Sequence, residues 1–103
     1  MAPSQLEIKT KALGRLIKEE SLYQDELKAQ EAHVEQLKSS GADQYDLKKQ
    51  VEVLDDTKNV IPEIRKKIDE AQQSLEEFLK EYQGTEDLTA SKENIELAQK
   101  ILK

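Results

Sequence analysis

Hydrophobic residues recur at seven-residue intervals through the first third of the chain, the spacing of the buried seam of a coiled-coil helix. Two rows, offset by three residues, make this seam: Leu6, Leu13, Leu27 and Val34, then Leu16, Tyr23 and Leu37. Ser4 supplies an N-cap hydroxyl, and Glu7 three residues later completes a capping box. Gly41 suits the left-handed residue that follows a helix. The pattern therefore predicts a helix over residues 4–38.

The most regular row of the chain follows, with apolar residues spaced seven apart and no gap: Leu47, Leu54, Ile61, Ile68, Leu75 and Tyr82. A companion row holds Val51, Ile64, Ala71 and Phe78. Pro62 lies inside this pattern and has no amide hydrogen for the carbonyl of Lys58. Because the row keeps its phase on both sides of Pro62, the sequence predicts one helix over residues 44–82 with a kink at Pro62, not a break.

A shorter stripe with three- and four-residue spacing comes after Gly84: Leu88, Ser91, Ile95, Ala98 and Leu102. It predicts a third helix over residues 86–102, and no alternating run of apolar and polar residues predicts a strand. The fold expected is all-α, a single domain over residues 1–103. Two long helices and a short third, joined by short connections, indicate an elongated up-down-up three-helix bundle with coiled-coil-like packing.

Charged residues make up 37% of the chain and hydrophobic residues 36%, with a formal net charge of −6. An acidic chain does not present the basic face that nucleic-acid binding requires. There is no cysteine for disulfides or thiolate metal sites. The N-terminus lacks the apolar run of a signal peptide, and no stretch is apolar for long enough to span a membrane. We expect a soluble cytoplasmic protein with neither nucleic acid nor membrane as a partner.

Residues suited to catalysis or to metal binding do not gather in the sequence. The only histidine, His33, lacks the glutamate three residues away that a helical di-metal site would use. Arg15 and Arg65, the only arginines, are too far apart in sequence to suggest an anion-binding cluster. The sequence thus predicts a binding scaffold with no catalytic, cofactor or metal site. Glu20 and Gln30 interrupt the first seam and leave open whether a second copy of the chain covers it.

Several segments along nearly the whole chain resemble, in order, the tubulin-specific chaperone A (tubulin-folding cofactor A) family. They are residues 11–13, 15–20, 30–34, 45–50 (Tyr-Asp-Leu-Lys-Lys-Gln), 52–57, 61–62, 78–80 and 82–87. The similarity is greatest to fungal members. What the resemblance implies is a three-helix bundle that captures β-tubulin in the pathway to αβ-tubulin heterodimers, without nucleotide, metal or other cofactor. It also implies a cytoplasmic, cytoskeleton-associated protein, with other tubulin-folding cofactors as further candidate partners.

The resemblance carries no sharp site signature, so we nominate exposed residues of the matching segments as candidates for binding the partner. They are Lys18, Glu19, Glu31, Tyr45, Lys48, Lys49, Glu52, Asp55 and Asp56. The alternative is a structural or tethering helical bundle of the spectrin type, which has this length and plan. Spectrin-type repeats usually place tryptophan in the bundle, and this chain has none.

Overall fold

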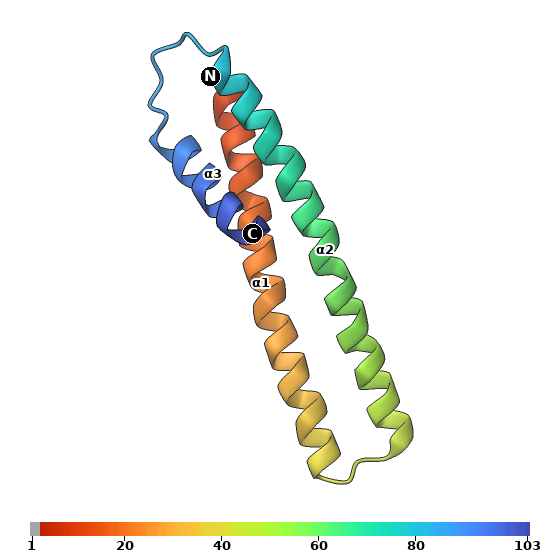
Figure 1. Ribbon diagram of the computed structural model, residues 1–103. Coiled ribbons are helices and arrows are strands. Elements are labelled where there is room, and N and C mark those ends of the chain that lie inside the picture. The colour runs from red at the N-terminus through yellow and green to blue at the C-terminus, as the bar shows by residue number, and fades with distance from the viewer. Residues whose placement is uncertain (1–2) are drawn as a thin grey trace.

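The computed structural model describes residues 3–103 as an antiparallel pair of long helices with a short third helix (Figure 1). The helices are α1 (Gln5–Ser39), α2 (Gln44–Lys80) and α3 (Thr89–Leu102), and the described residues contain no strand. Met1 and Ala2, which the sequence places within the expected domain and N-terminal stretch, lie outside the described residues. The molecule measures 62 × 29 × 16 Å. The predicted all-α, elongated up-down-up bundle is confirmed.

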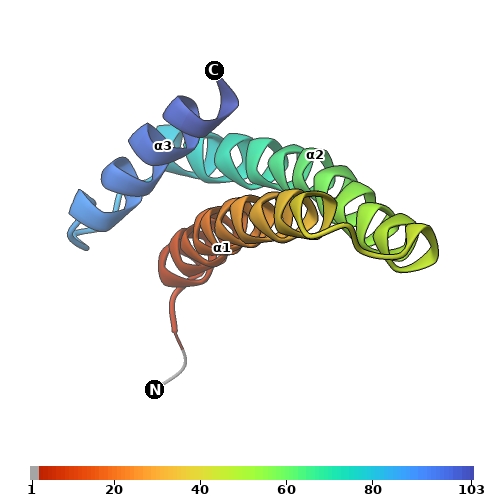
Figure 2. The ribbon, with the colours of Figure 1, turned by 90° about the horizontal axis from the view of Figure 1, so that it is seen from below.

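The bundle has three helices along only part of its length. Figure 1 shows α3 beside the first half of α1 and the second half of α2, while the far end of the rod is a two-helix hairpin. Figure 2 shows from below that α3 lies across the pair and that both long helices are curved. One end of the rod is therefore two helices thick and the other three.

Local sequence sets both ends of α1. The Ser4 hydroxyl accepts a hydrogen bond from the Glu7 N–H at 3.2 Å, as an N-cap does, and donates to Glu86 Oε2 at 2.8 Å. At the other end Gly41 has a φ of 72°, a conformation that glycine adopts without steric cost. The Ala42 N–H returns to the Leu37 carbonyl at 3.1 Å, so the turn satisfies a carbonyl that the helix end leaves free.

Pro62 lies inside α2 without interrupting it. Ile61 and Ile68, on either side, are both buried, so the hydrophobic row keeps one phase through the proline as predicted. Figure 2 shows α2 curving smoothly along its length, as α1 does without a proline, so the curvature is not specific to Pro62 and the predicted kink stays a prediction.

The core lies where all three helices meet. Its fully or nearly fully buried residues come from each helix: Leu6, Leu13, Ile64, Ile68, Leu75 and Ala98. Half-buried aromatic residues of the predicted seams, Tyr23, Phe78 and Tyr82, pack against this cluster. In the two-helix part of the rod, Val34 and Leu54 are buried between α1 and α2. The seven-residue rows are thus the interior of the molecule.

The third helix begins at Thr89, three residues later than the sequence predicted. The expected start at residue 86 was wrong because Asp87 forms a local turn instead. Its Oδ1 accepts hydrogen bonds from the Thr89 N–H at 3.0 Å and from the Thr89 hydroxyl at 2.6 Å. An aspartate that binds the backbone two residues ahead favours a turn over a helical conformation. The second helix likewise ends at Lys80, before the expected residue 82.

The turn at Asp87 makes the start of α3 sensitive to acid. Hydrogen bonds from the Thr89 hydroxyl and then from its N–H lower the pKa of Asp87. A carboxyl whose pKa is lowered by folding stabilises the folded state above its unfolded pKa, and this contribution disappears as the pH falls through the folded pKa. We therefore expect the loss below about pH 4. An NMR carboxyl titration should place the Asp87 pKa below that of the same residue in a Thr89→Val variant. Equal values in the two proteins would contradict the assignment.

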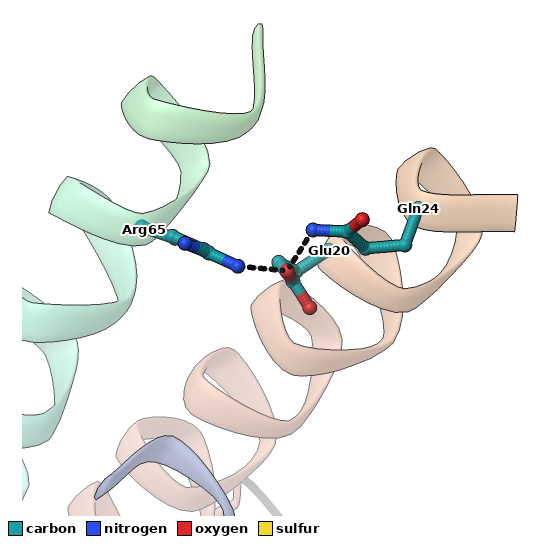
Figure 3. A network of polar contacts seen from close by, with 3 residues as sticks. All are labelled: Glu20, Gln24 and Arg65. Atoms are coloured by element: carbon teal, nitrogen blue, oxygen red, sulfur yellow. Dashed lines mark hydrogen bonds and ion pairs between the residues drawn. The ribbon is translucent and has the colours of Figure 1, made fainter. Parts of the chain in front are cut away.

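Polar residues on the seams find partners within the chain. Glu20 is 6% exposed, and its Oε1 accepts from Gln24 Nε2 at 3.0 Å and pairs with Arg65 Nη2 at 3.4 Å (Figure 3). Gln30 donates through Nε2 to the side chain and the carbonyl of Gln50, at 3.0 and 3.1 Å. The two interruptions of the first seam are therefore satisfied between α1 and α2. A homodimer stays a prediction that these residues do not require.

Candidate partner-binding surface

Exposed side chains of the long helices are the candidates for binding a partner. Residues 3–103 contain no group of three or more histidine, aspartate or glutamate side chains that could hold a metal ion. None of the helices in this range combines the length and apolarity needed to cross a membrane. His33 is exposed on α1. The question is then which exposed residues lie together.

Six of the nine nominated residues form one continuous surface on the first three turns of α2. Counted from Tyr45, the other five follow at three, four, seven, ten and eleven residues, which places all six on the same side of a helix. All six are exposed, and we call them the outer stripe: Tyr45, Lys48, Lys49, Glu52, Asp55 and Asp56. The cations lie nearer the hairpin turn and the carboxylates further along α2. The stripe therefore has a positive end and a negative end.

Tyr45 is the one hydrophobic residue of the outer stripe, and 62% of its surface is accessible. The Lys49 ammonium lies over its ring, 4.7 Å from the centroid, one helical turn away. Such cation–π contacts at exposed sites contribute about 0.5–1 kcal/mol. The contact orients the ring and leaves one of its faces to solvent, so the aromatic surface remains available to a partner.

The other three nominated residues are not brought together. Lys18 and Glu19 are adjacent on α1 and diverge by about 100° around the helix. Glu31 is next to Gln30, whose hydrogen bonds to Gln50 place it level with the outer stripe. Glu31 is therefore level with the outer stripe along the rod but on the other long helix, whereas Lys18 and Glu19 lie further along the rod.

Sequence reasoning missed four exposed apolar residues on the helices. Ile8 is 46% exposed, Leu22 55%, Val53 47% and Leu97 45%. Each falls outside the seven-residue rows that define the core. That mismatch is the signal that could have identified them, because a large apolar residue off the seam has no core to enter. Val53 comes one turn after Lys49 and adds apolar area beside the outer stripe.

Comparison with known proteins identifies the family. The family model described as "Tubulin binding cofactor A" matches residues 1–102. The chain belongs to this family. A Saccharomyces cerevisiae protein named tubulin-specific chaperone A is 58% identical over 103 residues, covering 99% of this chain and 97% of that protein. The human protein of the same name is 33% identical over 89 residues, or 86% of this chain and 82% of its own length.

Solved structures agree with the family assignment. A structure titled "RBL2P, beta-tubulin binding post-chaperonin cofactor" matches with a TM-score of 0.91 and 57% identity, covering 96% of this chain and 98% of that one. Tubulin folding cofactor A from Arabidopsis thaliana matches with a TM-score of 0.72 and 32% identity, covering 94% and 88% of the two chains. Tubulin binding cofactor A is a family of chaperones rather than of enzymes, so the predicted family and the non-enzymatic role are both confirmed.

Proposed function

We propose that this chain is a chaperone that binds free β-tubulin and stabilises it in the pathway that leads to αβ-tubulin heterodimers. The observation that carries the proposal is the likeness to the solved structure of a β-tubulin binding post-chaperonin cofactor. It extends over 96% of the chain at 57% identity, with a TM-score of 0.91. In this proposal the chain acts as one three-helix domain in the cytoplasm, associated with the cytoskeleton. Other tubulin-folding cofactors are further partners.

We place a main contact with β-tubulin on the outer stripe, with Glu31 on α1 at the same level and Lys18 and Glu19 further along the rod as additional contacts. The positive and negative ends of the stripe fit a partner only in one direction, because the reverse direction would oppose like charges. Tyr45 adds an exposed ring of the kind enriched at the centre of interfaces. The charges set orientation and association rate, while the ring and Val53 add apolar contact.

The experiment is capture of purified β-tubulin, compared with intact αβ-heterodimer, by the immobilised protein at two salt concentrations. We expect retention of free β-tubulin but not of the heterodimer, and weaker retention at high salt because ions screen exposed charges. Affinity that does not change with salt would contradict the electrostatic contact. Retention of neither form would overturn the proposal and return the spectrin-type bundle to consideration.

A variant with the charges of the outer stripe neutralised tests the location of the contact. It replaces Lys48 and Lys49 with glutamine, Glu52 with glutamine and Asp56 with asparagine, so the net charge does not change. We expect roughly a tenfold or greater loss of β-tubulin affinity, the sum of several exposed charge contacts. The matched control neutralises two lysines and two glutamates that are likewise exposed, further along α2: Glu63, Lys66, Lys67 and Glu70. Equal losses in both variants would show that the contact is not confined to the stripe.

A further inference from the structure

A groove of about 680 Å³ lies between the beginnings of α1 and α3, away from the outer stripe. Asn94 fixes its floor by donating through Nδ2 to the Thr10 carbonyl at 3.1 Å. Gly14 lets the Asn94 amide approach α1 closely, since a Cβ there would lie 3.2 Å from Asn94 Nδ2. Ala90, on the α3 side, adds only a methyl group. Small residues, Gly14 and Ala90, therefore line the groove beside the point where Asn94 joins α3 to α1.

Three cations line the groove on α1. Lys11, Arg15 and Lys18 are spaced by four and three residues, so they follow one another along one side of the helix. No carboxylate lines this groove, and none within residues 3–103 lies within ion-pair distance of the three cations. A row of unpaired cations beside a cavity stands out on a chain with a net charge of −6. It is a surface that attracts negative charge locally.

Apolar side chains accompany these cations. Ile8 lines the groove and is 46% exposed. Leu97 is 45% exposed and comes three residues after Asn94, on the same side of α3. Two of the large exposed apolar residues of the molecule thus belong to the helix faces that form this groove. A ligand for it needs an apolar group as well as negative charge.

Acidic residues limit the length of the cationic row. At one end an adjoining hollow, which Lys11 also lines, contains Glu7, Glu86 and Asp87. At the other end Glu19 follows Lys18 directly in α1. The seven residue steps from Lys11 to Lys18 span about 10 Å of helix. An extended peptide covers that distance with about three residues, at roughly 3.3 Å each.

We propose that this groove binds a short acidic peptide segment of a partner protein, a run of carboxylate residues next to one apolar residue, of which the alternate carboxylates face the groove. The carboxylates pair with Lys11, Arg15 and Lys18, and the apolar side chain packs against Ile8. A nucleic acid fits less well because its backbone carries charge without interruption and would meet the acidic residues at both ends. The groove is a different surface from the outer stripe and shares only Lys18 with the proposed tubulin contacts, and the proposal is tested without tubulin.

The test is fluorescence anisotropy with a fluorescein-labelled synthetic peptide that has a run of glutamates followed by leucine in a glycine-serine context. We expect saturable binding that weakens roughly tenfold when Lys11, Arg15 and Lys18 are replaced by glutamine. The matched control replaces Lys28, Lys58 and Lys67 by glutamine, which changes the net charge equally at exposed residues elsewhere. It should bind the peptide as the unaltered protein does. Equal weakening in both variants would show only a net-charge effect and overturn the proposal.

A second variant, Ala90→Phe, fills the groove and leaves every charge in place. It should also weaken binding of the peptide, and a version of the peptide with serine in place of leucine should bind less tightly to the unaltered protein. Circular dichroism checks that each variant keeps its helical content. No effect of Ala90→Phe, or equal binding of a labelled oligouridine of matched charge, would overturn the assignment of the groove to an acidic peptide.

Discussion

Replacing Leu13 by alanine should lower the free energy of unfolding by about 2–5 kcal/mol. Leu13 is completely buried and belongs to the core cluster in which α1 meets Ile68 and Leu75 of α2 and Ala98 of α3. Truncation removes buried apolar surface and leaves a cavity whose walls, on three different helices, can close only in part. Against a total stability of about 5–15 kcal/mol for a domain of ordinary size, this is a large fraction. Urea denaturation followed by far-UV circular dichroism measures it.

Leu22→Ala is the matched control, because it makes the same substitution on the same helix. Leu22 is 55% exposed, so its truncation should change the free energy of unfolding by no more than about 0.5 kcal/mol. A loss at Leu22 as large as that at Leu13 would mean that Leu22 is covered in solution, for instance by a second copy of the chain.

Replacing Ser91 by aspartate should destabilise the molecule by about 2–4 kcal/mol, the second largest effect we expect. Ser91 is 2% exposed, and its hydroxyl is 2.6 Å from that of Thr10, which is 8% exposed. A carboxylate there would be buried against α1 beside a hydroxyl and would also be too large for the space. α3 can respond by detaching from α1. The destabilisation therefore cannot exceed the free energy with which α3 packs against α1 and α2. The same urea denaturation measures the change.

Ala90→Asp provides the comparison for Ser91→Asp. It adds the same carboxylate one residue earlier, in the same first turn of α3, where the helix dipole favours negative charge. Because Ala90 is exposed, its replacement should leave stability within about 0.5 kcal/mol of the unaltered protein. If Ser91→Asp changed the free energy of unfolding as little as Ala90→Asp, the contact between the Thr10 and Ser91 hydroxyls would not be buried in solution.

The sequence predicted the interior well because a seven-residue row has one structural meaning. Leu54, Ile61, Ile68 and Leu75 belong to one row and are all buried, on both sides of Pro62. The row needs only the repeat of a helix and the requirement that its apolar face be covered. The start of α3 was harder to predict, because Asp87 can form either a helix N-terminus or a turn. Its hydrogen bonds to Thr89 decide the outcome, and they depend on the local backbone geometry.

The candidate surfaces were predicted less completely than the core. The spacing of Tyr45, Lys49, Glu52 and Asp56 already places them on one side of a helix, so the outer stripe could be derived from the sequence. The groove could not, since it depends on how α3 packs against α1. Gly14 and Asn94 are eighty residues apart in the chain and are juxtaposed only by that packing. Periodicity identifies the residues of one helix face, but it does not show where two helices diverge.

The unequal thickness of the rod has a consequence for its motions. Breaking the hairpin near its turn exposes only what two helices bury between them, whereas opening the other end also separates α3 from the core cluster. Local unfolding costs less where less apolar surface is buried. The hairpin end should therefore unfold locally more often than the three-helix end. A partner bound at the outer stripe would hold the more mobile end of the rod and reduce its fluctuations.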